Sequence, residues 1–327
     1  MENKKKNIWK STLNEPTKKE IKEKLSIDPD NEILNPLVDY IFKRIFTADE
    51  KQSKTALINF INSILEHEND DMIVDLTIVN PQIPVDRGEQ KKSIFDIRAK
   101  YNSGRQAVIE MQKNLTADFK KRSQHIISKS YASQEISGSD YDKLEKCYLI
   151  CITDFDIIKE TTEYIKDYRY RDRQGNDLSD DETIVFLDLS KIESVLGKSV
   201  DEMTNVEKWA IFFKYVTDDS KRDILNKILN REEGIKMANN ILLEVSKDEE
   251  TRAYYESELI FELDQRGRFR QAKQEGREEG IEEAERKAHD EKIGMVKEML
   301  LEGEPMKKIL KYSKFPEDKI RDIEKTL

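Results

Sequence analysis

The sequence predicts an α/β protein in which helices flank a mixed β-sheet. Three patterns favour this fold class: apolar residues recur at helical spacing over 36–65, they alternate with polar residues over 93–112, and an apolar run covers 146–153. Helical patterns return from about residue 203. Because helices and strands are interleaved along the chain, we expect the strands to share one sheet that the helices cover.

The N-terminal part of the chain is expected to hold an arm, two helices and one strand. Residues 1–24 carry eight lysines against four glutamates, which predicts a basic, mobile arm over 1–30; a plain solvated tail is the alternative. The helical spacing over 36–65 is interrupted near Thr47-Ala48-Asp49, so two helices are expected. The segment 72–83 then reads as a strand that ends at Asn80-Pro81.

The stretch 93-SIFDIRAKYNSGRQAVIEMQ-112 is typical of a β-hairpin. A three-residue loop at 102–104, with Gly104 at a positive φ, keeps the apolar residues of both strands on one face, whereas a two-residue loop would separate them. Residues whose numbers sum to 206 then lie opposite each other. The predicted apolar pairs are Phe95 with Met111, Ile97 with Ile109, and Ala99 with Ala107.

The same register brings two acids together. Asp96 lies opposite Glu110, and Gln112 follows Glu110 on the same face. Opposed side chains have Cβ atoms ~4.5–5.5 Å apart, so two carboxylates there destabilise the pair unless a cation lies between them. A divalent metal is one candidate for that cation. The alternative is an ordinary solvent-exposed hairpin face on which Arg98 and Lys100 neutralise the acids.

The remaining elements are expected in the following order. A basic amphipathic helix covers about 116–137, a central strand covers 146–153, and 163–176 with 183–190 forms a further β pair. Residues 207–216 form an amphipathic helix, and 248–303 form a long charged helix that is either solvated or used for oligomerisation. The last segment predicts helices separated by Gly303 and Pro316, as a packing module or a small helix-turn-helix-like unit.

Composition narrows the class of protein. The 327 residues are 37% hydrophobic and carry a formal net charge of −10, so any contact with a nucleic acid must come from a local basic patch. Cys147 and Cys151 lie in the apolar strand and are expected to be reduced core residues, which favours a cytoplasmic location. No stretch has the ~18–20 apolar residues of a membrane span, and the N-terminus has no apolar signal region.

The arrangement Asp-x13-Glu-x-Gln across the hairpin resembles the core of the PD-(D/E)xK nucleases. Two flanking segments support this: 35-NPLVDYIFKRIF-46 resembles the opening motif of the transposase-associated, recombination-promoting branch, and 118-DFKKRSQHIISKSYASQEISGSDYDKL-144 resembles its basic helix. The resemblance covers roughly residues 31–200. The chain departs from the pattern at Phe95, where the family has Pro, and at Gln112, where the motif usually has Lys, so the role of that lysine is unfilled.

This resemblance implies a restriction-endonuclease-like fold. It also implies the function of a metal-dependent DNA endonuclease that promotes recombination or is associated with a mobile element. Mg²⁺ or Mn²⁺ would be held by Asp96 and Glu110, and DNA would be the partner. The candidate catalytic residues are Asp96, Glu110, Gln112 and, from the helix before the sheet, Asp39. The candidate nucleic-acid contacts are Lys43, Lys120, Lys121, Arg122, Lys129 and Tyr131.

Alternatives remain for the function and for the organisation of the chain. A non-catalytic nucleic-acid-binding or assembly protein on a degenerate nuclease fold is the second hypothesis, and a nuclease toxin of phage defence is a variant of the first. The expected domains are the nuclease-like 31–200, a helical 201–290 and a small C-terminal module 291–327. The C-terminal helices are the expected surface for a homo-oligomer.

Overall fold

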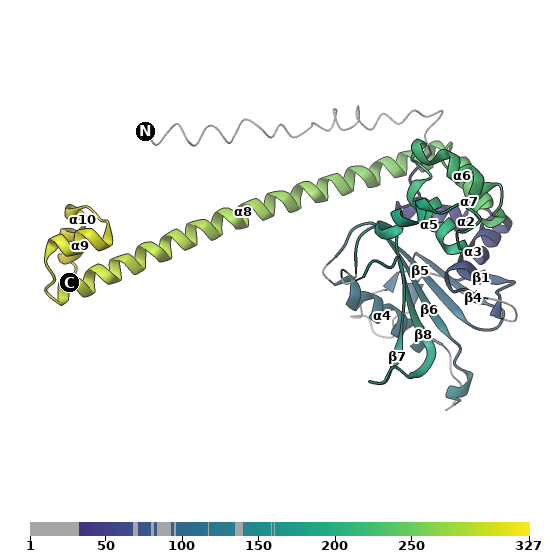
Figure 1. Cartoon of the computed structure of the whole chain (residues 1–327), viewed down its shortest axis with the longest axis horizontal. Coiled ribbons are helices and arrows are strands. Elements are labelled where there is room, and N and C mark those ends of the chain that lie inside the picture. The colour runs from purple at the N-terminus through teal and green to yellow at the C-terminus, as the bar shows by residue number, and fades with distance from the viewer. Residues whose placement is uncertain are drawn as a thin grey trace. The chain divides into compact units, whose positions relative to one another are not determined.

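A computed structural model describes residues 33–67, 71–79, 82–83, 93–94, 96–116, 118–134, 140–157, 159 and 161–327. The predicted basic arm over 1–30 therefore lies outside the described residues. The described part of the chain is mixed α/β, with a six-stranded sheet in the order β1-β4-β5-β6-β8-β7 (Figure 1). The strands are β1 (Leu76–Ile78), β4 (Ile97–Tyr101), β5 (Gln106–Gln112), β6 (Cys147–Thr153), β7 (Ile165–Arg171) and β8 (Asp177–Asp188).

The sheet combines antiparallel and parallel pairs. β4 pairs antiparallel with β1 and β5, β7 pairs antiparallel with β8, and the central pairs β5·β6 and β6·β8 are parallel. A separate two-stranded ribbon joins β2 (Gln82–Ile83) to β3 (Ser93–Ile94). Every residue of β6 is buried, as its unbroken apolar run predicts for a central parallel strand.

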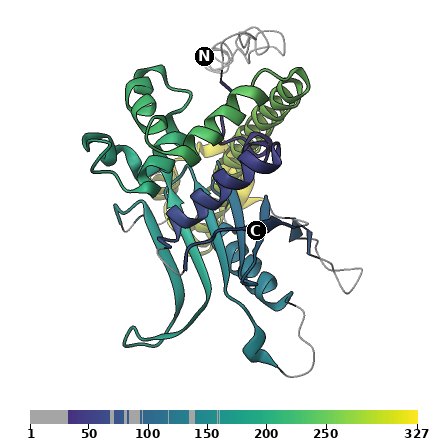
Figure 2. The same cartoon turned by 90° about the vertical axis from the view of Figure 1, so that its right-hand side faces the viewer.

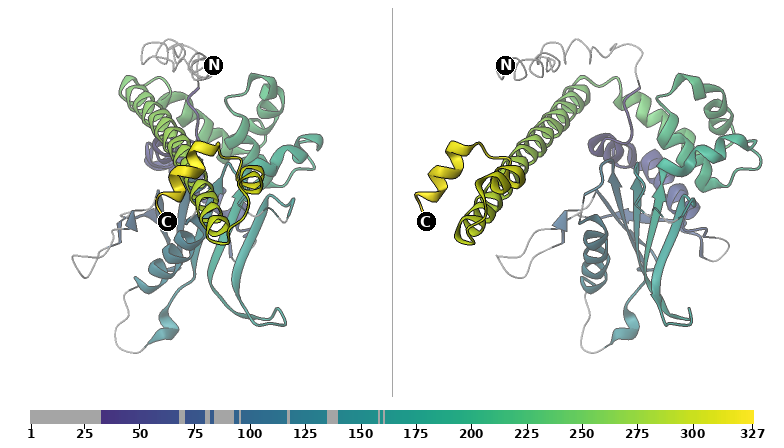
Figure 3. Two further views of the ribbon diagram at one scale, coloured as in Figure 1. Left: turned by 90° about the vertical axis from the view of Figure 1, so that its left-hand side faces the viewer. Right: turned by 60° about the vertical axis from the view of Figure 1, so that its left-hand side comes forward.

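Helices cover both faces of the sheet. The short helices before it are α2 (Asp39–Thr47) and α3 (Glu50–Ile64), and they are separate because Asp49 caps α3 by accepting a hydrogen bond from the N–H of Gln52. α4 (Phe119–Ala132) packs on one face, against a cluster that includes Val108, Leu149 and Phe186 (Figure 3). The C-terminal end of α3 lies on the other face, where Ile64 lines a cavity with Tyr148 and Val185.

Further helices complete the first compact unit, which ends at Glu256. They are α5 (Asn205–Tyr215), α6 (Arg222–Leu229) and α7 (Glu233–Val245). Trp209 of α5 is fully buried and packs against Phe46 of α2 and Phe60 of α3. The predicted domain boundary near residue 200 stays a prediction.

The second compact unit is Ser257–Leu327. It contains most of α8 (Glu249–Leu301), then α9 (Met306–Ser313) and α10 (Glu317–Glu324), as the Gly303 and Pro316 signals predict. Gly303 adopts a φ of 73°, and Val296, Ile309, Ile320 and Ile323 form a small core between the three helices. None of the helices in the described part of the chain has both the length and the hydrophobicity that a membrane span requires.

The strand predicted over 72–83 is the main correction to the expected elements. Only Leu76–Ile78 joins the large sheet. The side-chain amide of Asn62 bonds both the N–H and the C=O of Ile73 at 2.9 Å, which removes those backbone groups from any β ladder. Val74 is 85% exposed, so the apolar character of this segment does not reflect a buried strand.

Candidate active site

The β4–β5 hairpin has the predicted register. Ile97 pairs with Ile109 and Ala99 with Ala107, while the N–H of Gly104 donates to the C=O of Tyr101 at 2.9 Å across the three-residue loop. Gly104 has a φ of 93°. The expected register and loop are therefore confirmed. The predicted pair of Phe95 with Met111 lies outside the described residues, because Phe95 is not described.

Asp96 and Glu110 meet as the register requires, although Asp96 occupies a bend just before β4. The N–H of Asp96 donates to Oε1 of Glu110 at 3.3 Å, and the N–H of Met111 donates to Oδ2 of Asp96 at 2.7 Å. Each carboxylate is thus fixed by a backbone N–H of the opposite strand. One oxygen of each side chain, Oδ1 of Asp96 and Oε2 of Glu110, is left to other partners.

Both acids are largely withdrawn from solvent. Glu110 is only 4% exposed, because β5 lies between β4 and β6 and α4 covers the face on which Glu110 lies. The interpretation of this face as a solvent-exposed hairpin surface is therefore wrong. Arg98 does not neutralise the acids either, since its guanidinium donates to Gln106 and Ser133.

Burial and mutual repulsion disfavour the charged forms. Burial, followed by the charges of Glu110 and Asp39, raises the pKa of Asp96 to about 8. Burial raises the pKa of Glu110 to about 7, against the opposing effect of Arg122. The two groups titrate as an interacting pair, so the upward direction belongs to both. Perturbed carboxylates in such a pair are typical of functional sites.

α2 contributes a third acid and a lysine to the same place. Lys43 Nζ lies 2.7 Å from Oδ2 of Asp39 and 3.2 Å from Oδ1 of Asp96. Asp39 and Lys43 are four residues apart, so one helix face presents both. Burial lowers the pKa of Lys43, but Asp96 and Asp39 outweigh it and raise that pKa above its usual value. The structure therefore brings Asp39, Lys43, Asp96 and Glu110 together.

α4 contributes an arginine from the opposite side. Arg122 Nη2 lies 3.8 Å from Oε2 of Glu110, and the guanidinium lies over the ring of Phe119 at 5.2 Å. Its Nε and Nη2 atoms are buried and have no hydrogen-bond partner among the described residues. Buried N–H donors without a partner are costly unless an anionic group binds there. Arg122 is thus oriented towards the site while retaining donors for a ligand.

The other predicted contacts lie farther from the acids or make no contact with them in the structure. Gln112 is half-buried and follows Glu110 on β5. Lys120 and Lys121 are exposed in the first turn of α4, beside Arg122. Tyr131 lies more than two turns along α4, where it packs against the core cluster near Cys147. Lys129, two residues before Tyr131, lies in the last turn of α4 and is half-buried.

The residues present fit a divalent cation. Asp96 and Glu110 supply the carboxylate oxygens that Mg²⁺ prefers, and the two oxygens not fixed by the backbone are those that already face the positive groups of Lys43 and Arg122. Burial is the main cause of the raised pKa values of both carboxyl groups, so a bound cation would compete with protons for them. Within the described ranges, no cluster of three or more His, Cys, Asp and Glu side chains has a metal-binding arrangement, so the fit rests on the two carboxylates alone.

Comparison with known proteins identifies the family. A family model described as PD-(D/E)XK nuclease family transposase matches residues 36–272. The chain belongs to this family. The match extends from α2, which carries Asp39 and Lys43, into α8, and it includes every element that builds the site. The curated proteins and the solved structures contain no match.

In this member of the family, Lys43 is predicted from the sequence as a nucleic-acid contact. In the structure its amine lies between Asp39 and Asp96, and its contact with nucleic acid stays a prediction. The Asp39/Lys43 spacing of four residues was the available signal, since it shows that both side chains share a helix face. What the sequence alone does not show is that this face is turned towards β5.

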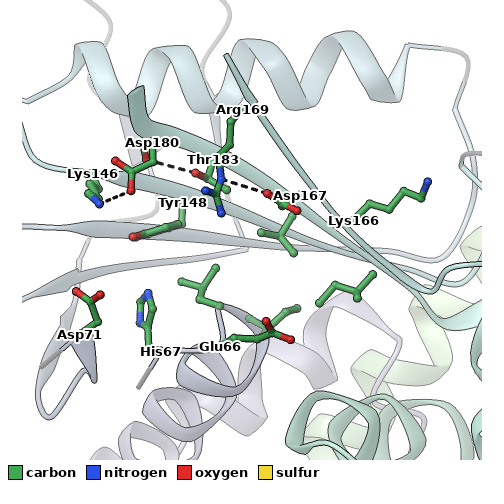
Figure 4. Close-up of a pocket in the computed structure, with 14 residues that line it drawn as sticks. Glu66, His67, Asp71, Lys146, Tyr148, Lys166, Asp167, Arg169, Asp180 and Thr183 are labelled. Atoms are coloured by element: carbon green, nitrogen blue, oxygen red, sulfur yellow. Dashed lines mark hydrogen bonds and ion pairs between the residues drawn. The ribbon is translucent and has the colours of Figure 1, made fainter. Parts of the chain in front are cut away.

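The chain also has a polar cavity of about 300 Å³ on the sheet face opposite α4 (Figure 4). Tyr148 and His67 form one wall, with ring centroids 5.7 Å apart. Four of its charged side chains form two ion pairs: Lys146 with Asp180, and Arg169 with Asp167. This cavity is therefore distinct from the carboxylate site, which lies on the α4 face.

Proposed function

We propose that this chain is a metal-dependent DNA endonuclease that serves a mobile element or promotes recombination. The observation that carries the proposal is the pair of buried carboxylates, Asp96 and Glu110, held in contact between two cationic side chains. Family membership supports nuclease chemistry. The geometry supplies the residues for it.

Asp96 and Glu110 are the proposed ligands of Mg²⁺ or Mn²⁺, together with the backbone carbonyl near Met111. When bound, such an ion would lower the pKa of a water molecule and neutralise charge on the phosphate. The chain's own task is to hold both carboxyl groups in one orientation. The backbone donors from Asp96 and Met111 fix one oxygen on each side chain for this purpose.

Lys43 is proposed to supply the positive charge that Gln112 lacks. Its amine lies 3.2 Å from Asp96, so it can stabilise a nearby hydroxide or phosphate oxygen while Asp39 holds it in place. Gln112 is proposed to orient the attacking water through its amide. Arg122 is proposed to donate its unpaired N–H groups to the scissile phosphate as negative charge develops.

The proposed DNA contacts continue from Arg122 along α4. Lys120 and Lys121 are exposed in its first turn and can reach phosphates on either side of the scissile bond. Lys129 and Tyr131 would contact the backbone farther along the helix. A local basic surface of this kind offsets the acidic net charge of the whole chain.

Plasmid cleavage by the purified protein tests the proposal. Supercoiled DNA should be nicked or linearised with Mg²⁺ or Mn²⁺ and left intact with EDTA, and Asp96→Asn should abolish cleavage. Asp218→Asn is a matched control, because Asp218 is a partly exposed acid outside the site whose side chain accepts a hydrogen bond from the N–H of the nearby Ser220. Equal cleavage by the Asp96 variant and the parent would disprove the assignment of the site.

A non-catalytic DNA-binding protein is the alternative function. The contacts of Lys43 and Arg122 with the carboxylates favour it, because they partly neutralise the pair without a metal. The same assay separates the two functions. Binding of DNA by the parent protein, with no cleavage under any metal condition, would establish the alternative.

A further inference from the structure

β7 is a terminal strand of the large sheet. One of its edges pairs with β8, and no strand of the described chain lies along the other (Figure 2). Its last five residues are exposed, and they include Tyr168 and Tyr170 at 41% and 52%. An edge strand of seven residues presents backbone N–H and C=O groups that can extend the sheet with another chain.

We propose that β7 pairs antiparallel with β7 of a second copy of this chain, around a twofold axis that passes through Tyr168. This inference is independent of the proposed nuclease activity. It also differs from association through the C-terminal helices, because it uses the edge of the sheet.

Symmetry limits the registers that such a pair can adopt. The twofold axis must run perpendicular to the sheet, so that each residue meets one on the same face of the other copy and the paired numbers add to an even sum. Centring on Tyr168 gives a sum of 336. Asp167 then meets Arg169 of the second copy twice, Lys166 meets Tyr170, and Ile165 meets Arg171.

Charge selects this register over its neighbours. Centring on Asp167 or on Arg169 would bring that residue against its own copy, and centring on Lys166 would do the same. Centring on Tyr170 would oppose Arg169 to Arg171. Like charges directly opposite are destabilising, and opposite charges are favourable. The Tyr168 register alone among these five avoids every such repulsion, and beyond the strand it also sets Glu163 against Arg173.

In the folded chain, the side chains of Asp167 and Arg169 are placed as this register requires. Asp167 and Arg169 lie on one face of β7, where Arg169 Nε is 3.1 Å from Oδ2 of Asp167 (Figure 4). A second copy would extend this ion pair into a ring of four alternating charges. The pairing of β7 with β8 is irregular because β8 has extra residues between Ile184 and Ser179. β7 has no such insertion, so it is one continuous strand.

Charge reversal with restoration is the first test, performed on the full chain by sedimentation velocity. The parent should be a dimer at micromolar concentration. Asp167→Arg and Arg169→Asp should each weaken association at least tenfold, and the double variant should restore it, because the exchange recreates every pair. Circular dichroism should give the same fold for all four proteins.

A symmetric cross-link is the second test and does not depend on the charge variants. Tyr168→Cys should form an interchain disulfide on mild oxidation, because residues opposite at the axis have Cα atoms about 4.5–5.5 Å apart, within disulfide range. Tyr170→Cys is the matched control: its two copies would lie about 14 Å apart along the pair. Cys147 and Cys151 are buried and should contribute no background.

Two results would overturn the proposal. The first is a parent protein that stays monomeric at 100-fold higher concentration and whose Tyr168→Cys variant does not cross-link. The second is a dimer whose affinity is unchanged by both single reversals, which would assign association to another surface. Cross-linking of the Tyr168 variant but not of the Tyr170 variant, together with restoration by the double reversal, would establish the register.

Discussion

Asp96 and Glu110 are joined through the backbone as well as through their charges. The N–H of Asp96 donates to Glu110, and the N–H that follows Glu110, that of Met111, donates back to Asp96. Neither acid can turn away from the other without giving up a hydrogen bond. Their repulsion is therefore built into the fold, and it makes stability depend on pH.

The first prediction concerns that dependence. Both carboxyl groups have folded-state pKa values, about 8 and about 7, above their unfolded values, so the folded protein binds protons more tightly than the unfolded chain. Their contribution to stability is fully present below pH ~4 and is lost as the pH rises to about 8. Asp96→Asn with Glu110→Gln should remove this loss, on the order of a few kcal/mol by pH 8. Urea unfolding at pH 5 and pH 8 measures it; an equal pH dependence in variant and parent would contradict it.

A bound metal ion should reduce the loss of folding stability that occurs as the pH rises to about 8. Because a cation competes with protons for the two carboxylates, Ca²⁺ or Mg²⁺ should raise the melting temperature of the parent at pH 8 and much less at pH 5. The Asp96→Asn variant should show neither increase. Thermal melting with and without EDTA measures this, and a shift that is equal at both pH values would place the metal elsewhere.

A lysine exchange tests the proposed role of Lys43. Lys43→Gln should reduce cleavage by about 10²-fold or more, in the range of a lost acid–base or electrostatic group. Adding Gln112→Lys should restore part of the rate, because that change returns the lysine of the usual motif. Initial rates of plasmid nicking measure the effect. A double variant as slow as Lys43→Gln would show that the two positions do not share a role.

The basic end of α4 should account for the salt dependence of DNA binding. If Lys120, Lys121, Arg122 and Lys129 make about three to four phosphate contacts, the slope of log K against log salt should be roughly −3 to −4. Lys120→Gln with Lys121→Gln should flatten it by up to ~2 units. Lys227→Gln with Lys236→Gln, two exposed lysines on α6 and α7, is the matched control. Equal flattening in both pairs would remove α4 from the interface.

Two glycines with the same φ allow the cost of backbone strain to be measured apart from the cost of a steric clash. Gly104 and Gly175 both have a φ of 93°, but a Cβ at Gly104 would lie 2.8 Å from Cγ of Glu145, while a Cβ at Gly175 would meet nothing within 4 Å. Gly175→Ala should cost about 1 kcal/mol from the backbone alone. Gly104→Ala should cost more, as measured by urea unfolding. Equal losses would mean that the Glu145 side chain moves aside freely.

Local pattern was enough to predict the hairpin register, the division between α2 and α3, and the central position of β6. Each depends on neighbours in sequence: the parity of Ile97 and Ile109, the cap at Asp49, and the apolar run of β6. The strand at 72–83 was predicted too long, because the side chain of Asn62, distant in sequence, forms hydrogen bonds with the backbone N–H and C=O of Ile73. Long-range contacts of this kind leave no local signal.

The candidate site also has some features that the sequence predicts and others that it does not. The facing of Asp96 and Glu110 follows from strand parity. Their burial does not, because it requires β6 on one side of β5 and α4 above it. The positions of Lys43 and Arg122 depend on how α2 and α4 pack against the sheet. Their charges were visible in the sequence, whereas their direction was not.

The strand order has a further consequence for a pair of chains joined at β7. From β5 of one copy to β5 of the other there would be seven strand spacings, about 34 Å at ~4.8 Å each, which is roughly one turn of B-DNA. The perpendicular twofold axis would set both carboxylate pairs on the same side of one continuous sheet. A duplex lying across them would present strands of opposite polarity to the two sites. Paired chains should then convert supercoiled DNA directly to linear product, whereas the Asp167→Arg variant should release nicked circles first.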